Sequence, residues 1–124
     1  MHQGHLDLIM RAKKENDVCY VVVCGYNNEP RADEIGLTLN RRFSLVKQMF
    51  KDDEQVKVVM VNDTELGIDE SMSDSNWDIW LYYVTKKLIS EGQIENWFTW
   101  YVGEQSYVDS LLKRTKDFWK INDV

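Results

Sequence analysis

The chain has 124 residues, enough for one domain with a sizeable hydrophobic core. Its net charge of −6 and pI near 4.9 argue against a nucleic-acid partner but are compatible with a small anionic ligand. No apolar run approaches the roughly 18 to 20 residues of a membrane span, and no signal-peptide pattern is present, so we expect a cytoplasmic protein without a membrane partner. Cys19 and Cys24 match neither a disulfide framework nor a zinc motif, so we expect buried free thiols.

Hydrophobic periodicity in the first half of the chain predicts helix and strand in alternation. Residues 6–14 place their apolar side chains on one helical face. Residues 18–24 form a continuous β-branched and apolar run, which is typical of a strand buried on both faces. Helical spacing returns at 37–50, and 56–61 is a second candidate for a buried strand.

The second half continues the alternation after a polar connection over 62–76. A helical apolar stripe covers 77–89, a third strand is expected at 97–102, and a further helix is expected around 108–112. Alternating helices and buried strands predict an α/β fold, a parallel sheet with flanking helices. The first strand of such sheets is usually central, whereas this sequence opens on a helix, so we expect the first strand to be missing.

Two histidines at the start of the first predicted helix are the main candidates for chemistry. His2 and His5 are three residues apart and fall on one face of the first helical turn. The free N–H groups and the positive dipole end of the helix favour an anion there. Gly4 has no side chain that would hold a phosphate away from the backbone. The alternative is a pair of exposed histidines without a role, and no third ligand marks a metal site.

Four other residues are candidates for ligand contact, and two of them, Arg42 and Trp77, have a structural alternative. Arg42 offers a guanidinium fork for a phosphate or carboxylate, or it belongs to a solvated helix face. Trp77 offers a stacking platform for a cationic aromatic ligand, or it packs in the core with Trp80. Gly103 and Glu104 follow the third predicted strand, where doubly wound folds contact their ligands.

Several segments together resemble the nucleotidyltransferase superfamily that carries an HxGH motif. They are Met1–Ile9 (MHQGHLDLI), Cys24–Tyr26 (CGY), Gly36–Phe43 (GLTLNRRF), Trp77–Trp80 (WDIW) and Tyr101–Tyr107 (YVGEQSY). The first segment carries the HxGH motif of the superfamily, and the other four point to one family within it. Over nearly its whole length, the chain resembles the nicotinamide-nucleotide adenylyltransferase domain of bacterial NadR-type proteins.

The resemblance implies a Rossmann-like nucleotidyltransferase fold and a reaction that joins nicotinamide mononucleotide to ATP, giving NAD and pyrophosphate. It also implies Mg²⁺ as cofactor, bound mainly through the ATP phosphates, and no residue of this sequence is assigned as a metal ligand. The mononucleotide phosphate is already an anionic nucleophile, so positioning and charge stabilisation carry the catalysis. The resemblance assigns catalysis to His2 and His5, nucleotide binding to Gly4, Gly103 and Glu104, and substrate binding to Tyr26, Arg42 and Trp77.

The sequence also departs from the family pattern. The family has a strand and a loop of the form GxFxPxHxGH ahead of the second histidine, and a later S-x-T-x-x-R segment that clamps the ATP phosphates. This sequence contains neither part in full, so we expect residues 1–124 to be a single domain shortened at both ends, with impaired activity. The alternatives are a nucleotidyltransferase with another phosphorylated acceptor, such as phosphopantetheine, and a non-catalytic nucleotide-binding regulatory module. A homo-oligomer is compatible with each.

Overall fold

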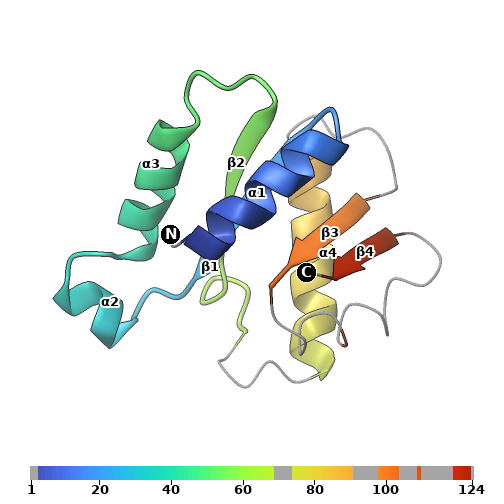
Figure 1. Cartoon of the computed structure of the whole chain (residues 1–124). Helices are drawn as coiled ribbons and strands as arrows, with labels where there is room; N and C mark the ends of the chain where they lie inside the picture. The colour runs from blue at the N-terminus through green and yellow to red at the C-terminus, as the bar shows by residue number, and fades with distance from the viewer. Residues whose placement is uncertain (1–2, 69–73, 91–97, 104–108, 110–118, 124) are drawn as a thin grey trace.

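The computed structural model describes residues 3–68, 74–90, 98–103, 109 and 119–123 (Figure 1). In chain order the elements are α1 (Gln3–Glu15), β1 (Cys19–Gly25), α2 (Pro30–Glu34), α3 (Leu39–Met49), β2 (Val56–Asn62), α4 (Asp74–Ser90), β3 (Phe98–Val102) and β4 (Trp119–Asp123). The predicted alternation of helices and strands is therefore confirmed. Among the residues described, no helix is both long and apolar enough for a membrane span.

The four strands form two parallel pairs rather than one continuous sheet. β1 pairs with β2, with Gly25 opposite Asn62 at the carboxyl end, and β3 pairs with β4, with Val102 opposite Asp123. Within the described part of the chain, β1 and β3 are thus each hydrogen-bonded to a strand on one side only.

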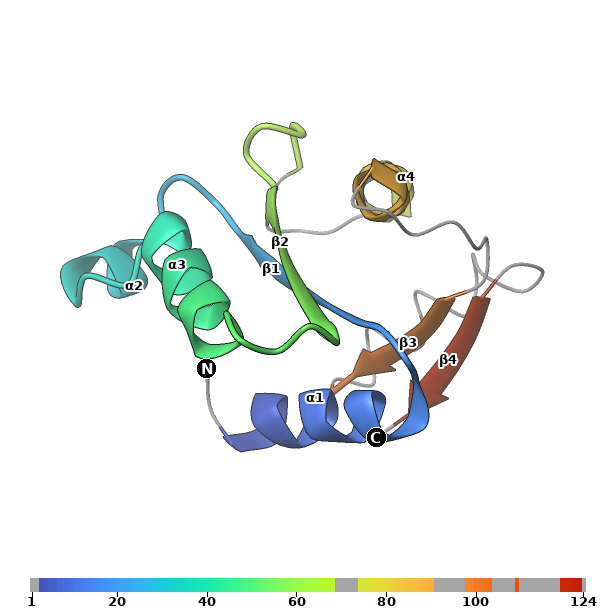
Figure 2. The same cartoon turned by 90° about the horizontal axis from the view of Figure 1, so that it is seen from above.

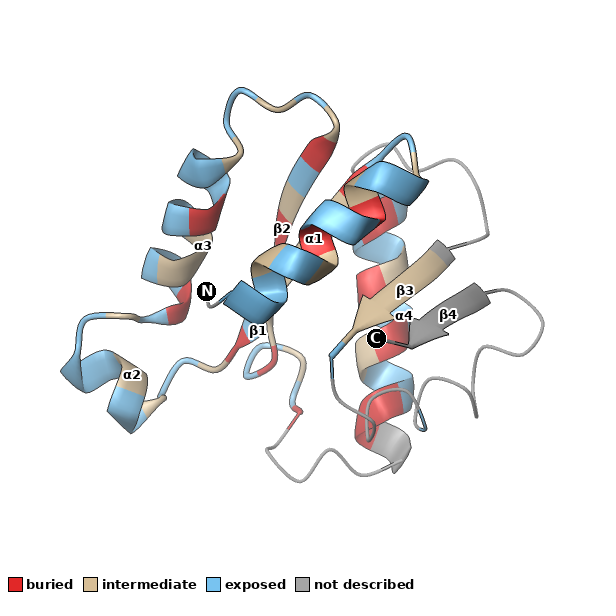
Figure 3. Ribbon diagram, in the orientation of Figure 1, coloured by how far each residue is buried: buried red, intermediate tan, exposed pale blue. Residues whose placement is uncertain are grey.

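Helices on opposite sides of the strands hold the two pairs together. Figure 2 shows α1 along one side and α4 along the other. On the α4 side, Val84 and Leu88 pack with Val59 and Val61 of β2, and Trp100 of β3 joins this cluster. The buried positions of α4 and β2 in Figure 3 mark this shared core, which links the two strand pairs through side chains instead of backbone hydrogen bonds.

Polar contacts fix the carboxyl end of α1 to both strand pairs. The Tyr101 hydroxyl of β3 donates a hydrogen bond to the Glu15 carboxylate at 2.7 Å and accepts one from the Asn16 amide at 2.9 Å. Beside the start of β2, the Gln55 amide donates to the backbone carbonyls of Lys13 and Asn16, both at 2.6 Å. These contacts set the direction of α1 and hence the position of its amino end.

Three sequence expectations need correction. β1 is not buried throughout: Cys19 and Gly25 are buried, whereas Cys24 is exposed, because the strand is paired on one side only. Burial does raise the pKa of the Cys19 thiol. A short helix, α2, forms between residues 24 and 37, where no element was predicted, since the fixed φ of Pro30 suits the first helical turn. β4 was not anticipated, and the helix expected around 108–112 lies outside the described residues except for position 109.

Candidate functional site

The described part of the histidine motif, Gly4 and His5, lies at the amino end of α1, as the sequence predicts. Gly4 and His5 are exposed in the first turn, and that turn contains no acidic residue that would neutralise the positive end of the helix. Gly103 follows β3 directly, and the Leu8 side chain of α1 lies 3.5 Å from the position that a Cβ on Gly103 would occupy. The end of β3 therefore lies against α1 at Leu8, one helical turn after Gly4. His2 and Glu104 lie outside the described residues.

A second group of predicted residues lies where β1 ends. Tyr26 follows the strand and is half-buried. Arg42, in the first turn of α3, donates from Nη2 to Oε2 of Glu29 at 2.5 Å. The Arg42 side chain is only 28% exposed, so it does not lie on a freely solvated helix face. Of the two chemical partners that the sequence offered, phosphate or carboxylate, the structure pairs this guanidinium with a carboxylate.

The ion pair rests directly on the backbone of Gly25, the last residue of β1. A Cβ at this position would lie 2.9 Å from Oε2 of Glu29, 3.1 Å from Cδ1 of Leu39 and closer still to the Arg42 guanidinium. A glycine at the end of β1 is therefore what allows the charged pair to approach the strand.

Asp63, directly after β2, is the second buried polar group at this edge. It is 6% exposed, and its Oδ1 has no hydrogen-bond partner among the described residues. Its backbone N–H donates to the Gly25 carbonyl at 2.8 Å, which ties the ends of the two strands together. Burial, and then the negative charge of Glu29, raise the pKa of the Asp63 carboxyl group to about 6.

The loops after β1 and β2 are held together by side-chain hydrogen bonds. The Asn62 amide donates to the Asn27 side-chain oxygen at 2.7 Å, and the Asn27 N–H donates to the Thr64 hydroxyl at 2.9 Å. Asn62 also accepts from the Thr64 N–H at 3.0 Å. The carboxyl edge of this strand pair, where open α/β sheets bind ligands, therefore has a fixed rim.

Trp77 packs in the core with Trp80, which is the structural alternative to a ligand-stacking role. It is 7% exposed and packs edge-on against Trp80, with ring centroids 5.6 Å apart. Trp80 in turn lies 5.8 Å from the Trp100 ring of β3. Stacking of a ligand ring on Trp77 stays a prediction, and it requires the indole to turn out of this cluster.

Sequence reasoning missed Glu29 and Asp63. Asp63 had a usable signal, because an acid directly after a buried strand lies at the edge where parallel sheets bind ligands. Glu29 had none, since its role depends on a contact with α3 thirteen residues further along the chain.

Comparison with known proteins places this geometry in a family. Residues 1–122 match the profile of the cytidylyltransferase-like proteins. The chain belongs to the cytidylyltransferase-like family. Two solved structures share its fold: the NadR protein in complex with NR has a TM-score of 0.80 and 33% identity over 99% of the chain, and the NadR protein in complex with NAD and AMP-PNP has a TM-score of 0.77 and 31% identity over the whole chain.

The chain spans about a third of the NadR proteins, 34% and 35% of their respective lengths. No curated protein sequence matches it significantly. Family membership and the NadR-like fold together confirm the resemblance to a nucleotidyltransferase domain of the NadR type. In a cytidylyltransferase-like fold, the amino end of α1 and the carboxyl ends of the strands form one candidate nucleotide-binding region.

Proposed function

We propose that the chain catalyses adenylyl transfer from ATP to nicotinamide mononucleotide, giving NAD and pyrophosphate. The supporting observation is the 33% identity with NadR over 99% of the chain, in a fold where Gly103 lies against Leu8, one helical turn after Gly4. Solved NadR structures contain NR in one case and NAD with AMP-PNP in the other. Ligands of that class suit the exposed, acid-free first turn of α1.

The proposed reaction needs positioning and charge stabilisation more than acid–base chemistry. An oxygen of the mononucleotide phosphate attacks the α-phosphorus of ATP, and the bond from that phosphorus to the bridging oxygen of the β-phosphate breaks. Negative charge grows on the departing pyrophosphate and on the α-phosphate oxygens. In this proposal the His5 imidazole and the amides of the first turn of α1 donate hydrogen bonds to this charge.

In this proposal ATP enters as its magnesium complex. Among the described residues, no three His, Cys, Asp or Glu side chains gather closely enough to hold a metal ion. Mg²⁺ commonly keeps several waters and binds through substrate phosphates with one or two carboxylates, so phosphate-borne Mg²⁺ fits this donor set. The ion would supply charge neutralisation on the pyrophosphate, and the protein would orient the two substrates.

The direct test is NAD formation by the chain from magnesium ATP and nicotinamide mononucleotide, followed by chromatography. His5→Ala should lower kcat by about 10²- to 10³-fold with a much smaller change in KM, as expected for loss of one transition-state donor. Gln3→Ala is the matched control, because Gln3 lies in the same turn and its side-chain amide donates to the exposed Asp7 carboxylate at 2.8 Å. Equal kcat values for His5→Ala and the control would refute the assigned role.

Two other outcomes identify the alternatives. Pyrophosphate release with phosphopantetheine, and none with nicotinamide mononucleotide, would assign a different acceptor to the same fold. Binding of ATP without release of pyrophosphate in the presence of either acceptor would indicate a regulatory module. Calorimetry and a pyrophosphate assay on the same sample separate these cases.

A further inference from the structure

The Arg42 guanidinium is only partly satisfied by its carboxylate partner. Glu29 engages one nitrogen, Nη2, through one oxygen. The Nε of Arg42 is buried and has no hydrogen-bond partner among the described residues. A guanidinium prefers two parallel hydrogen bonds to a carboxylate or phosphate, so an anion that reached Nε as well would be a better partner than Glu29.

Glu29 is also placed so that its side chain can leave without disturbing the core. It precedes α2, a helix that buries no residue, and its side chain makes no capping hydrogen bond to that helix. The backbone of Glu29 anchors the turn instead, since its N–H donates to the Asp33 carboxylate at 3.2 Å and its carbonyl accepts from the Asp33 N–H at 2.8 Å. Loss of the Glu29–Arg42 contact therefore leaves these anchors in place.

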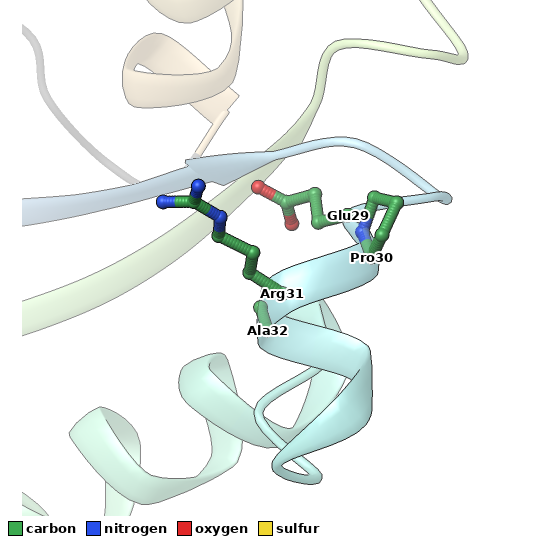
Figure 4. Close-up of a pocket in the computed structure, with 4 residues that line it drawn as sticks. All are labelled: Glu29, Pro30, Arg31 and Ala32. Atoms are coloured by element: carbon green, nitrogen blue, oxygen red, sulfur yellow. The ribbon is translucent and has the colours of Figure 1, made fainter.

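A second arginine lies beside the pair. Figure 4 shows the side chains of Glu29 and Arg31 projecting from the start of α2 toward the end of β1, where they line a depression with Pro30 and Ala32. Arg31 is exposed. Two guanidinium groups thus flank one displaceable carboxylate, while the fixed carboxyl group of Asp63 lies close enough to Glu29 for the two negative charges to oppose each other.

We propose that Glu29 is the resident anion of a phosphate subsite formed by Arg42 and Arg31. Its carboxylate occupies Arg42 in the free protein and swings out when the phosphomonoester group of a ligand takes its place. The inference rests on the proposed function, in which the acceptor nucleotide carries such a phosphate. It adds that Glu29 lowers the affinity of this site for that phosphate.

The test is the affinity of the chain for inorganic phosphate, measured by calorimetry for the native protein and for Glu29→Gln. Glutamine keeps the shape of the side chain and removes the charge that competes for Arg42, so phosphate should bind about tenfold more tightly. Glu34→Gln is the matched control, because it removes the same charge from an exposed position on the same short helix. Glu29→Asp, whose shorter side chain keeps the charge but reaches Arg42 less well, should give a smaller gain.

Three results would overturn the inference: unchanged or weaker phosphate binding by Glu29→Gln, an equal gain in Glu34→Gln, or a Glu29→Gln protein that does not fold. Adding Arg42→Gln to Glu29→Gln should abolish the gain, and retention of the gain would also contradict the assignment. Phosphate binding is measured without ATP or an acceptor. If the chain forms no NAD but Glu29→Gln shows the tenfold gain, the proposed function is rejected and the subsite is supported. If the chain forms NAD but the gain is absent, the function is supported and the subsite is rejected.

Discussion

Replacement of Asp63 by asparagine should stabilise the protein at neutral pH. The carboxyl group is 6% exposed, one of its oxygens has no partner among the described residues, and its pKa is raised from 3.8 to about 6. A rise of about two pKa units corresponds to at most about 3 kcal/mol, because each unit is worth about 1.36 kcal/mol. Screening by water at the edge of the strands lowers this ceiling, so we expect a gain of about 1 to 2 kcal/mol at pH 7.

The pH dependence gives this prediction its sign. A carboxyl group with a raised folded-state pKa holds its proton more tightly in the folded than in the unfolded protein. Its contribution to stability is therefore largest below pH 3.8 and is lost as the pH rises toward 6. The advantage of Asp63→Asn should grow between about pH 4 and pH 6.5 and be constant above.

Urea unfolding at a series of pH values measures this difference directly. Asp52→Asn serves as the control, since Asp52 is exposed and its substitution removes the same charge. A difference between native and Asp63→Asn proteins that is flat with pH would refute the reasoning. So would a native protein that gains stability relative to the variant as the pH rises.

Three further substitutions test the packing by denaturant unfolding. Tyr101→Phe removes the hydroxyl that joins β3 to the end of α1, and it should lower stability by about 1 to 2 kcal/mol; an unchanged midpoint would show that this contact is not formed. Gly25→Ala drives a methyl group into the Arg42 guanidinium and should lower stability by about 1 to 3 kcal/mol, whereas a stabilised protein would contradict the close approach. Val84→Ala, at a fully buried position of α4 that packs against β2, should lower stability by about 2 to 3 kcal/mol. A loss below about 0.5 kcal/mol would place Val84 outside the core.

Most elements were predictable because their sequences carry a clear period. The β-branched run of β1 and the apolar stripe of α4 were found within a few residues of their observed bounds. β4 escaped because Lys120 and Asp123 interrupt a strand of only five residues. α2 escaped because a proline marks the first turn of a helix as readily as it marks a loop.

The candidate site was predictable where ligand chemistry depends on local sequence. Gly4 and His5 lie in the first turn of a helix because an amphipathic pattern begins there. The state of Arg42 was not predictable, since its carboxylate partner comes from a separate loop that folds against α3. The burial of Trp77 was equally hidden, because a helical stripe does not reveal which of two neighbouring tryptophans reaches the core.

The activity proposed for this chain is adenylyl transfer from ATP to nicotinamide mononucleotide. The most direct measurement incubates the chain with magnesium ATP and equal amounts of nicotinamide mononucleotide and phosphopantetheine, and identifies the products by mass spectrometry. We predict NAD and an equal amount of pyrophosphate, with no dephospho-coenzyme product. Absence of NAD from a folded chain that binds ATP, or adenylylation of phosphopantetheine alone, would contradict the account.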